Sequence, residues 1–501
     1  MSAAGLIRAA PTEPVRPWLR HALDVETWRA VAAALGAPDA PDLLGLWADT
    51  LRVHALFIEP DGSDVLPVSV PVVGGVYPAL SPHRPAAAWF ERMVHDLWGH
   101  AAEGGTDLRP WLDHGRWPVH TPMALRPAPA GGASEPPEFL PVEGEDLHQI
   151  PLGPVHGTIT EPAHLRVTAE GETIRRVEVR LGYAHKGVLA LMRGKPPRAA
   201  ARYAARLSGD STVAHSIAYA RAAEAALATE APPRAHALRA VMAELERLAN
   251  HTGDFAAVLG AAGLGVPAAR WGWHREALLA AAEAGFGHRL MMDCVVPGGV
   301  AADIGPAGPA AILAALDALG GELPALARAL DPAGGLAGRL RGLGAVSPAL
   351  AARFAAGGPV GRAAGRGFDA RRRPGYPPYA GLDPAPAVLA AGDAEARLHV
   401  RLAELHASAG LLRRLLADLP EGRLTLTLPM ATGEGIGVAE GCRGDVWHWL
   451  RLDGGLVAAC FARDPGWLHW PLLEAAMQGG EVADLPLCAL SFNCSCSGVD
   501  L

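Results

Sequence analysis

Cysteine is scarce in this chain of 501 residues, and its few positions exclude several kinds of site. All six cysteines lie in the second half, and no C-x-x-C pattern is repeated, so the sequence predicts neither a disulfide framework nor a zinc site. Lysine is limited to Lys186 and Lys195, which is typical of a biased genome rather than of a functional demand. A reducing cytoplasm suits this cysteine usage.

Long apolar runs and an excess of basic charge are also absent. No stretch sustains the roughly 18 apolar residues of a membrane-spanning helix, and the N-terminus lacks the apolar core of a signal peptide. The formal net charge is -8, which argues against a nucleic-acid partner. We therefore expect a soluble chain that is able to dock on a membrane complex.

Half of the residues are apolar, enough for two or three domains with sizeable cores. Residues 1–125 alternate strand-like and helix-like patterns and predict a small α/β domain, and the proline- and glycine-rich residues 126–145 predict a linker. Residues 146–501 begin with a β-meander, continue through amphipathic helices such as the one beginning at Pro233, and return to strands from residue 423. The predicted fold class is α+β: an N-terminal α/β domain, then a mostly helical-bundle domain with β-structure at both of its ends.

Two stretches place polar groups beside apolar elements. Residues 202–226 bring hydroxyls, a carboxylate and an imidazole to the start of an apolar helix, where polar groups need partners or a role. Residues 485–501 are expected to form a strand followed by a small-residue turn. Between them, the glycine-rich TGEGIGV (residues 432–438) lies between predicted strands and is expected to be a hairpin turn.

Two sets of motifs resemble known families. Residues 91–118 contain E-R-x-x-x-D-L-x-G, then D-L-R and W-P, and this order resembles the 30 kDa-type subunit of respiratory complex I. Further motifs follow in one order: EPAHLRVTAEGE, RLSGDSTVAHSIAYARAAE, ELERLANHTGD, GEGIGVAEGCRGD and SFNCSCSGVDL. They resemble the large catalytic subunit of membrane-bound, energy-converting (group 4) nickel-iron hydrogenases and formate hydrogenlyases, which is similar to the 49 kDa quinone-site subunit of complex I.

In the hydrogenases, two pairs of cysteine thiolates hold nickel and iron, because soft sulfur ligands suit these metals. The resemblance places these ligands at Ser208, Ser211, Ser495 and Gly498. All four thiols are therefore missing, and neutral hydroxyls do not replace thiolates on such a centre. Cys494 and Cys496 are close by, but they have C-x-C spacing. The resemblance thus implies that this chain binds no nickel-iron centre and no other cofactor.

The resemblance also implies candidate site residues. Glu161, in the segment EPAH, resembles the hydrogenase carboxylate that relays protons, and burial there would favour its protonated form. The complex I tyrosine that holds the quinone headgroup has Gly209 in its place, so that binding mode is not expected. The candidate catalytic residues are Glu161, His164, Arg206 and Asp210, and the candidate cofactor-binding residues are His156 and His215. The alternative roles are structural: hydrogen-bonded or packed histidines, and an Asp210 that pairs with Arg206.

The function implied is that of a large subunit in a membrane-associated, complex I-like oxidoreductase that couples electron transfer to proton or ion movement without nickel. NADH or ferredoxin would be the donor and a quinone-type molecule the acceptor; no Rossmann fingerprint exists, so NAD(H) would bind another subunit. Expected partners are a small iron-sulfur subunit and membrane-embedded antiporter-like subunits, at the cytoplasmic face of the cell membrane. A non-catalytic scaffold subunit is the first alternative. A true hydrogenase is the second, and the missing thiols argue against it.

Overall fold

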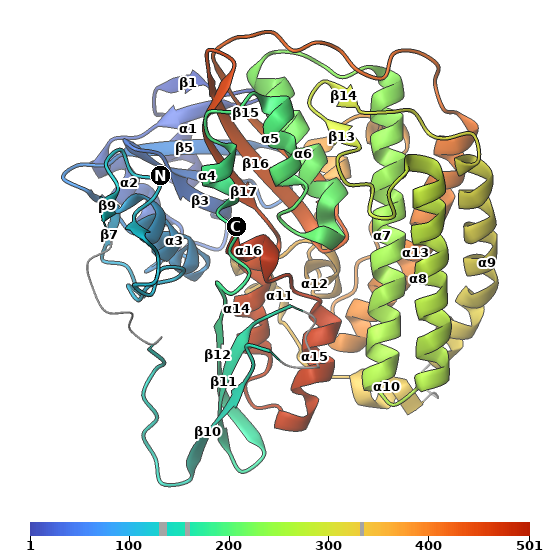
Figure 1. Cartoon of the computed structure of the whole chain (residues 1–501). Coiled ribbons are helices and arrows are strands. Elements are labelled where there is room, and N and C mark those ends of the chain that lie inside the picture. Colours follow the sequence, from blue (N-terminus) through green and yellow to red (C-terminus); the bar gives the residue numbers. More distant parts are fainter. Residues whose placement is uncertain (130–137, 156–160, 331–334) are drawn as a thin grey trace.

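The computed structural model describes residues 1–129, 138–155, 161–330 and 335–501. An N-terminal α/β region lies beside a larger region that is mostly helical, with a sheet between them (Figure 1). One main hydrophobic core runs through both regions. The predicted α+β class is confirmed. The limits of the predicted linker, part of which lies outside the described residues, stay a prediction.

A five-stranded sheet and three helices form most of the N-terminal region. The strands are β1 (Thr12–Pro14), β2 (Leu19–Ala22), β3 (Asp42–Ala48), β4 (Arg52–Ile58) and β5 (Val65–Pro71), in the order β1-β2-β5-β4-β3. The helices are α1 (Ala3–Arg8), α2 (Val25–Ala34) and α3 (Ala88–Trp98), and two short pairs join β6 (Val76–Pro78) to β7 (Ala101–Glu103) and β8 (Val119–His120) to β9 (Ala128–Pro129). Only β2 and β5 pair in parallel within the five-stranded sheet described here.

The predicted β-meander opens the larger region. It consists of β10 (Leu147–Leu152), β11 (His164–Glu170) and β12 (Thr173–Arg180), which pair antiparallel in chain order and extend away from the body of the molecule (Figure 1). Leu165 and Val167 on β11 are buried, and β12 packs against α14 (Gly466–Ala476). The base of this meander adjoins the C-terminal segment, which positions the candidate site.

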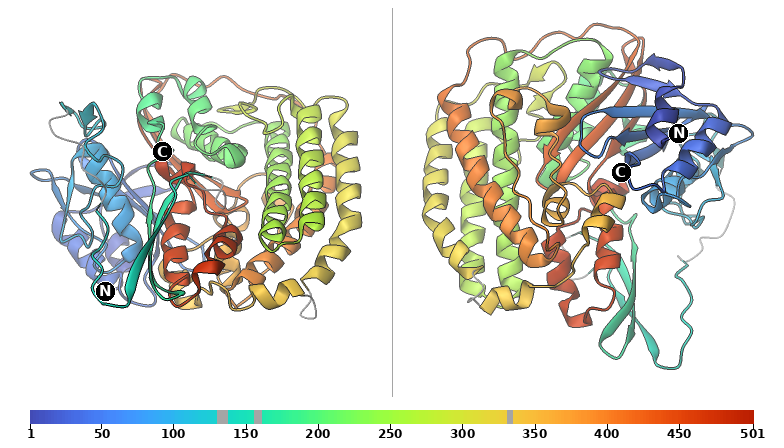
Figure 2. Two further views of the ribbon diagram at one scale, coloured as in Figure 1. Left: turned by 60° about the horizontal axis from the view of Figure 1, so that its bottom comes forward. Right: turned by 180° about the vertical axis from the view of Figure 1, so that it is seen from behind.

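Long helices form the bundle, and Figure 2 shows them side by side from two directions. They are α7 (Pro233–Ala261), α8 (Gly265–Phe286), α9 (Gly308–Ala329) and α13 (Ala394–Ala417). Proline at the first position of α7 has the predicted role, since its missing N–H would be unpaired there. Shorter elements complete the region: α4 (Val188–Met192), α5 (Pro197–Ala204), α6 (Thr212–Ala226), β13 (Val295–Val296), β14 (Gly299–Val300), α10 (Gly335–Leu340), α11 (Pro348–Arg353) and α12 (Gly358–Ala363).

Among the described helices, α9 alone is long and apolar enough to cross a bilayer by length and composition. Its most apolar window has a mean hydropathy of 1.5, and 33% of that window is buried. Ile312, Leu316 and Leu319 form its buried side, and the helix packs against α8 and α13. Core helices show the same composition, so this one helix is weak evidence for a membrane span.

A three-stranded antiparallel sheet joins the two regions: β15 (Gly433–Gly441), β16 (Gly444–Asp453) and β17 (Leu456–Arg463). The expected hairpin turn at residues 432–438 is wrong, because these residues form most of β15. Their glycines allow α6 to lie directly on the strand: a Cβ atom at Gly435 or Gly437 would overlap the helix carbonyls of Ala222 or Ala218. On the N-terminal side, Trp47 of β3 stacks on Phe461 of β17 with ring centroids 5.2 Å apart.

The chain after residue 423 differs from the prediction in two places. Residues 423–429 lie outside the named strands, and Thr425 forms only an isolated bridge with Gly299. The expected C-terminal strand is helix α15 (Leu485–Phe492), which has Pro486 in its first turn and ends at Asn493 with a left-handed backbone. A turn and the short helix α16 (Ser497–Asp500) follow. The corrected C-terminal end is therefore helical.

Candidate functional site

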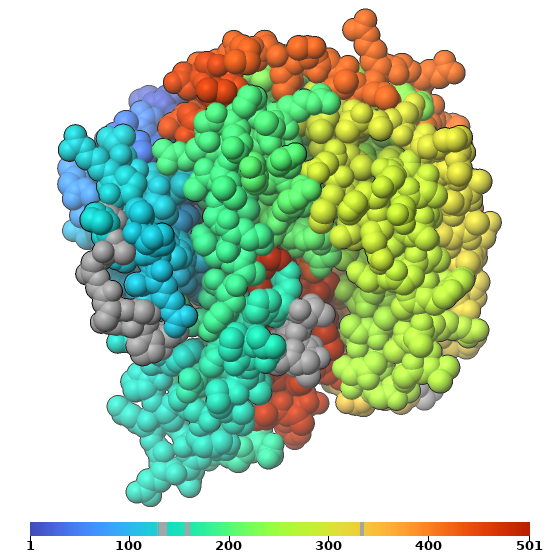
Figure 3. Space-filling view, in the orientation of Figure 1, coloured from blue at the N-terminus to red at the C-terminus, as the bar shows by residue number. Residues whose placement is uncertain are grey.

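Three segments that are far apart in the sequence meet at the candidate site. They are the residues before β11, the turn before α6, and the turn between α15 and α16. The Ser208 hydroxyl lies 3.2 Å from that of Ser495, and the Ser495 hydroxyl lies 3.2 Å from Oε2 of Glu161. Figure 3 shows the red C-terminal segment at the surface of this face, between the teal meander and the green helices. The three segments therefore meet around the Ser495 hydroxyl.

Glu161 is held by the C-terminal turn. Its carboxylate accepts hydrogen bonds from the backbone N–H groups of Cys496 and Ser497, the latter at 3.0 Å, and from the hydroxyls of Ser495 and Ser497. These four donors occupy both oxygens of the carboxylate. The side chain therefore has a fixed orientation beside two hydroxyls that are able to pass a proton.

Asp210 pairs with Arg443, which follows β15. The two groups form a bidentate ion pair, with Nη1 3.0 Å from Oδ1, and Nη1 also donates to the Ser211 hydroxyl at 2.9 Å. Burial alone would raise the pKa of Asp210, but the guanidinium and the Ser208 hydroxyl lower it to about 2. Arg443 is anchored in turn by the carbonyl and side-chain oxygens of Asn493. Asp210 is therefore a charged, fixed acceptor.

Asp464, just after β17, lies against Gly498, the fourth of the positions at which the resemblance places metal ligands. A Cβ atom at Gly498 would overlap its carboxyl group. The same carboxylate lies 3.2 Å from Nε2 of His215, whose Nδ1 is 3.1 Å from Nε2 of His448. Burial alone would raise the pKa of Asp464, but the hydrogen bond with His215 and the charge of Arg443 bring it below its usual value. All three side chains are buried, so they form an interior hydrogen-bonded chain behind Gly498.

The other candidates have different surroundings. Arg206 does not pair with Asp210; its guanidinium makes a partly exposed bidentate pair with Asp293, at 2.7 and 2.8 Å. His164 is the first residue of β11, and its ring lies 5.2 Å from that of Phe139. His156 lies outside the described residues. The structure thus places Glu161, Asp210 and His215 beside the four ligand positions. Arg206 and His164 contact Asp293 and Phe139 instead.

Sequence reasoning gave no role to Arg443, Asp464 or His448. Arg443 lies in the quoted segment GEGIGVAEGCRGD, so the resemblance pointed to its neighbourhood without naming its partner. His448 lies between two tryptophans in β16, and Asp464 directly follows the apolar strand β17; polar residues in such places need partners when buried. Polar residues within or next to apolar strands were therefore a sequence signal that could have identified His448 and Asp464.

Three protein families match separate segments of the chain. They are the 30 Kd subunit of respiratory-chain NADH dehydrogenase over residues 22–127, nickel-dependent hydrogenase over residues 186–258, and the 49 Kd subunit of respiratory-chain NADH dehydrogenase over residues 269–430. The segments follow the order of the motifs in the sequence.

Individual relatives match over longer stretches. The membrane-bound hydrogenase subunit alpha of Pyrococcus furiosus is 30% identical over 365 residues, which are 69% of this chain and 85% of the relative. The chain belongs to the large-subunit family of group 4 hydrogenases and complex I. Formate hydrogenlyase subunit 5 of Escherichia coli is 29% identical over 82% of this chain and 74% of its own length. An NADH-quinone oxidoreductase subunit of Dehalococcoides mccartyi is 29% identical over 67% of this chain and 93% of its own.

A solved structure supports the same fold for this member of the large-subunit family. One chain of the membrane-bound sulfane sulfur reductase, an archaeal respiratory membrane complex, superposes with a TM-score of 0.68. It is 24% identical, and the match covers 72% of this chain and 100% of that one. At this identity the similarity shows a common fold, and it does not show a common reaction.

A nickel-iron centre does not fit the donor set of this large subunit. Two of the ligand positions, Ser208 and Ser495, hydrogen-bond to one another, and Ser211 accepts from Arg443. The fourth, Gly498, has no side chain, and Asp464 lies where one would extend. Protonated hydroxyls and a guanidinium are not ligands for soft metals. What the site does hold is carboxylates, hydroxyls and an imidazole in contact, which are groups that accept and pass protons.

Proposed function

We propose that this protein is the large subunit of a membrane-associated oxidoreductase complex that couples electron transfer to proton or ion movement without a nickel-iron centre. The observation that carries the proposal is the hydrogen-bonded set of Ser208, Ser495 and Glu161 at the place where the family resemblance puts the metals. This set keeps proton-accepting groups where thiolate ligands are missing. Asp210 accepts from the Ser208 hydroxyl, and His215 contacts Asp464 behind Gly498.

The proposed assembly has three kinds of subunit. The residues that the structure describes include no group of three or more cysteine, histidine or acidic side chains able to hold a metal ion. Electrons would therefore arrive through a small iron-sulfur partner docked beside residues 206–211. Membrane-embedded antiporter-like subunits would carry the translocated ion, and the chain would lie peripherally on the cytoplasmic face of the membrane. The relatives named above include subunits of membrane-bound complexes, which supports this arrangement. NADH or ferredoxin as donor and a quinone-type acceptor complete the proposal.

Purification from native membranes tests the assembly. We expect a chain tagged at the exposed Met1 to co-purify with a small iron-sulfur protein and with polytopic membrane proteins. Mass spectrometry identifies the partners, and electron paramagnetic resonance of the reduced sample detects the cluster. An Arg206→Glu variant, which reverses charge beside residues 206–211, should lose the cluster signal while keeping the fold. A chain that is monomeric in its native cell, with no cluster protein attached, would contradict the proposal.

A scaffold subunit without catalysis is the second candidate. It is favoured by one observation: the Glu161 carboxylate is already satisfied by four donors, as a purely structural acid would be. The two candidates differ in what removal of the ionisable group does to turnover, and the Glu161→Gln variant described in the Discussion separates them.

A further inference from the structure

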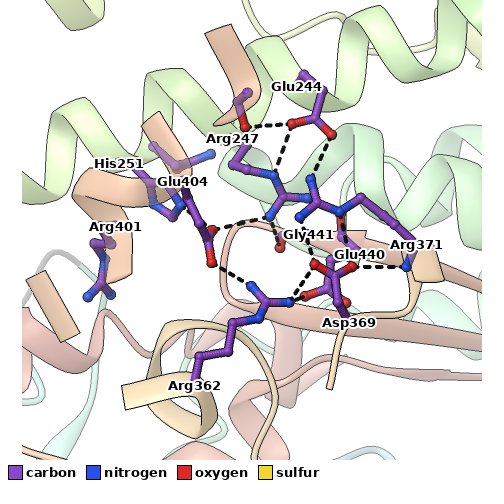
Figure 4. A network of polar contacts seen from close by, with 12 residues as sticks. Glu244, Arg247, His251, Arg362, Asp369, Arg371, Arg401, Glu404, Glu440 and Gly441 are labelled. Carbon is purple, nitrogen blue, oxygen red and sulfur yellow. Dashed lines mark hydrogen bonds and ion pairs between the residues drawn. The ribbon is translucent and has the colours of Figure 1, made fainter. Parts of the chain in front are cut away.

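A second set of buried charges lies deeper in the molecule, centred on Arg362 of α12 (Figure 4). We call it the Arg362 cluster. Its members are Arg247, Arg362, Arg371, Glu244, Asp369, Glu404 and Glu440. All of them are less than 5% exposed. Among the residues that the structure describes in this cluster, three guanidinium groups face four carboxylates, so one negative charge is in excess.

The four carboxylates share the positive charge unequally. Glu244 contacts Arg371 at 3.0 Å and also accepts from Tyr379 and Ser408 at 2.7 and 2.6 Å. Asp369 forms a bidentate pair with Arg371 and also contacts Arg362 at 3.0 Å.

Glu404 contacts both Arg362 and His251, the latter at 2.8 Å. Glu440 shares a single guanidinium nitrogen, Nη2 of Arg362, with Asp369, and its other oxygen accepts from the Ala370 N–H at 2.9 Å. Glu440 therefore has the weakest ion pairing of the four carboxylates, because the one guanidinium nitrogen that it contacts is shared.

A cleft gives this cluster access to solvent. A cavity of about 630 Å³ is lined by Asp369, Arg371, Tyr376 and Tyr379, together with the exposed side chains of Arg372 and other residues of the same loop. Asp369 lines the cleft and Glu440 does not, and both carboxylates contact the same nitrogen of Arg362. Asp369 is thus the carboxylate of the cluster that connects the cleft with Glu440, through the shared nitrogen of Arg362.

We propose that the Arg362 cluster is a proton-loading site in which Glu440 takes up one proton from the cleft, with Asp369 as the entry group. The step converts the Glu440 carboxylate to a carboxylic acid and removes the excess negative charge; no electron moves. The charged or titratable groups around Glu440 are Arg247 of α7, Arg362 of α12, Asp369 and Tyr376 of the loop after α12, and Asp445 of β16. Glu244, Arg371 and Glu404 lie one contact further away, on Arg247, Asp369 and Arg362 respectively. Burial and the neighbouring Asp369 charge raise the pKa of Glu440 to about 7, which agrees with this assignment.

The Arg362 cluster is connected to the candidate site. From Glu404 the contacts continue through His251 to Asp254, whose Oδ2 is 3.6 Å from Nδ1 of the imidazole. Asp254 accepts from the side-chain amide of Asn493 at 2.7 Å, and Asn493 anchors Arg443, the partner of Asp210. The proton-loading role adds to the proposed function, because a complex in which electron transfer drives proton movement can use a group that stores a proton. The use of the stored proton in coupling rests on the proposed function.

Infrared difference spectroscopy of the resting, purified complex tests the site without turnover. A protonated carboxylic acid has a C=O stretch that a carboxylate lacks, so spectra between pH 6 and pH 8 should contain a band with a midpoint near pH 7 that shifts in D₂O. Burial also raises the pKa of Glu246 and of Glu474 to about 8. The assignment therefore rests on comparison with Glu440→Gln, which should lose the band, and with the exposed control Glu172→Gln, which should keep it.

A second variant keeps the test decisive if Glu440→Gln does not assemble. Asp369→Asn removes the like charge beside Glu440, so the midpoint should move to lower pH by roughly 1–3 units. Identical spectra for wild type and Glu440→Gln, or an unmoved midpoint in Asp369→Asn, would overturn the assignment. Because no donor or acceptor is added, a failure here is distinct from a failure of the proposed function, which concerns turnover.

Discussion

Replacing Arg362 with methionine is expected to lower the free energy of unfolding by about 3–5 kcal/mol. The guanidinium is fully buried and contacts Glu404, Asp369 and Glu440 at once. Methionine fills much of the same volume but leaves carboxylates buried without their counter-charge, and uncompensated buried charge is what makes breaking such a pair costly. Urea unfolding of the purified protein, followed by circular dichroism, measures the change.

Arg372→Met is the matched control for this experiment. Arg372 lies in the loop that lines the same cleft, but its side chain is 49% exposed and is 3.5 Å from the exposed Asp383. We expect a change within about 0.5 kcal/mol, because exposed pairs contribute little. Adding Glu404→Gln to Arg362→Met should recover part of the loss, since one unpaired carboxylate is removed. Equal unfolding energies for Arg362→Met and Arg372→Met would contradict a charge-bearing role for the cluster.

Replacing Glu161 with glutamine is expected to leave assembly intact and to reduce proton-coupled turnover by roughly 100-fold or more. Glutamine keeps an oxygen that accepts from the Cys496 and Ser497 N–H groups, so the C-terminal turn retains its anchor. It has no exchangeable carboxyl proton, so the link from Glu161 to the Ser495 hydroxyl no longer passes protons. Ion translocation in native membrane vesicles and donor oxidation by the purified complex are the two measurements.

Two further variants sharpen this test of Glu161. Glu161→Asp retains an ionisable group and should restore part of the turnover with a changed pH profile, which a merely structural acid would not do. Glu172→Gln removes an exposed carboxylate in the β11–β12 turn and should behave as wild type. Full turnover in Glu161→Gln would reject the proton role and favour the scaffold subunit, and loss of assembly would assign Glu161 to structure.

Sequence periodicity predicted the elements in which apolar residues recur at regular intervals. The helix from Pro233 and the meander at residues 147–180 have a regular apolar pattern, and both are present. The residues 485–492 are a short, uniformly apolar run, and periodicity does not separate a buried strand from a buried helix in such a run. Pro486 lies in the first turn of the helix, where proline is favoured, and was the available signal for a helix.

Side-chain partners were the hardest feature to predict. The structural alternative for Asp210 was a pair with Arg206, four residues away, yet Asp210 pairs with Arg443, which lies 233 residues further along the chain. The glycines of β15 were interpreted as a turn because their role depends on the close approach of α6, a tertiary contact that no local pattern encodes. The resemblance to the large-subunit family supplied what periodicity lacked, because it placed Glu161, Ser208 and Ser495 together, and the three side chains are in contact.

Nickel content is the most direct test of the central claim, that this large subunit acts without a nickel-iron centre. Elemental analysis of the complex purified from native membranes should find nickel at the level of a preparation from untagged cells, and the same sample should show no hydrogen uptake with an artificial electron acceptor. The reason is local: Ser208 and Ser495 hydrogen-bond to one another, and Asp464 lies against Gly498. Nickel at about one atom per chain, together with hydrogen uptake, would contradict the account.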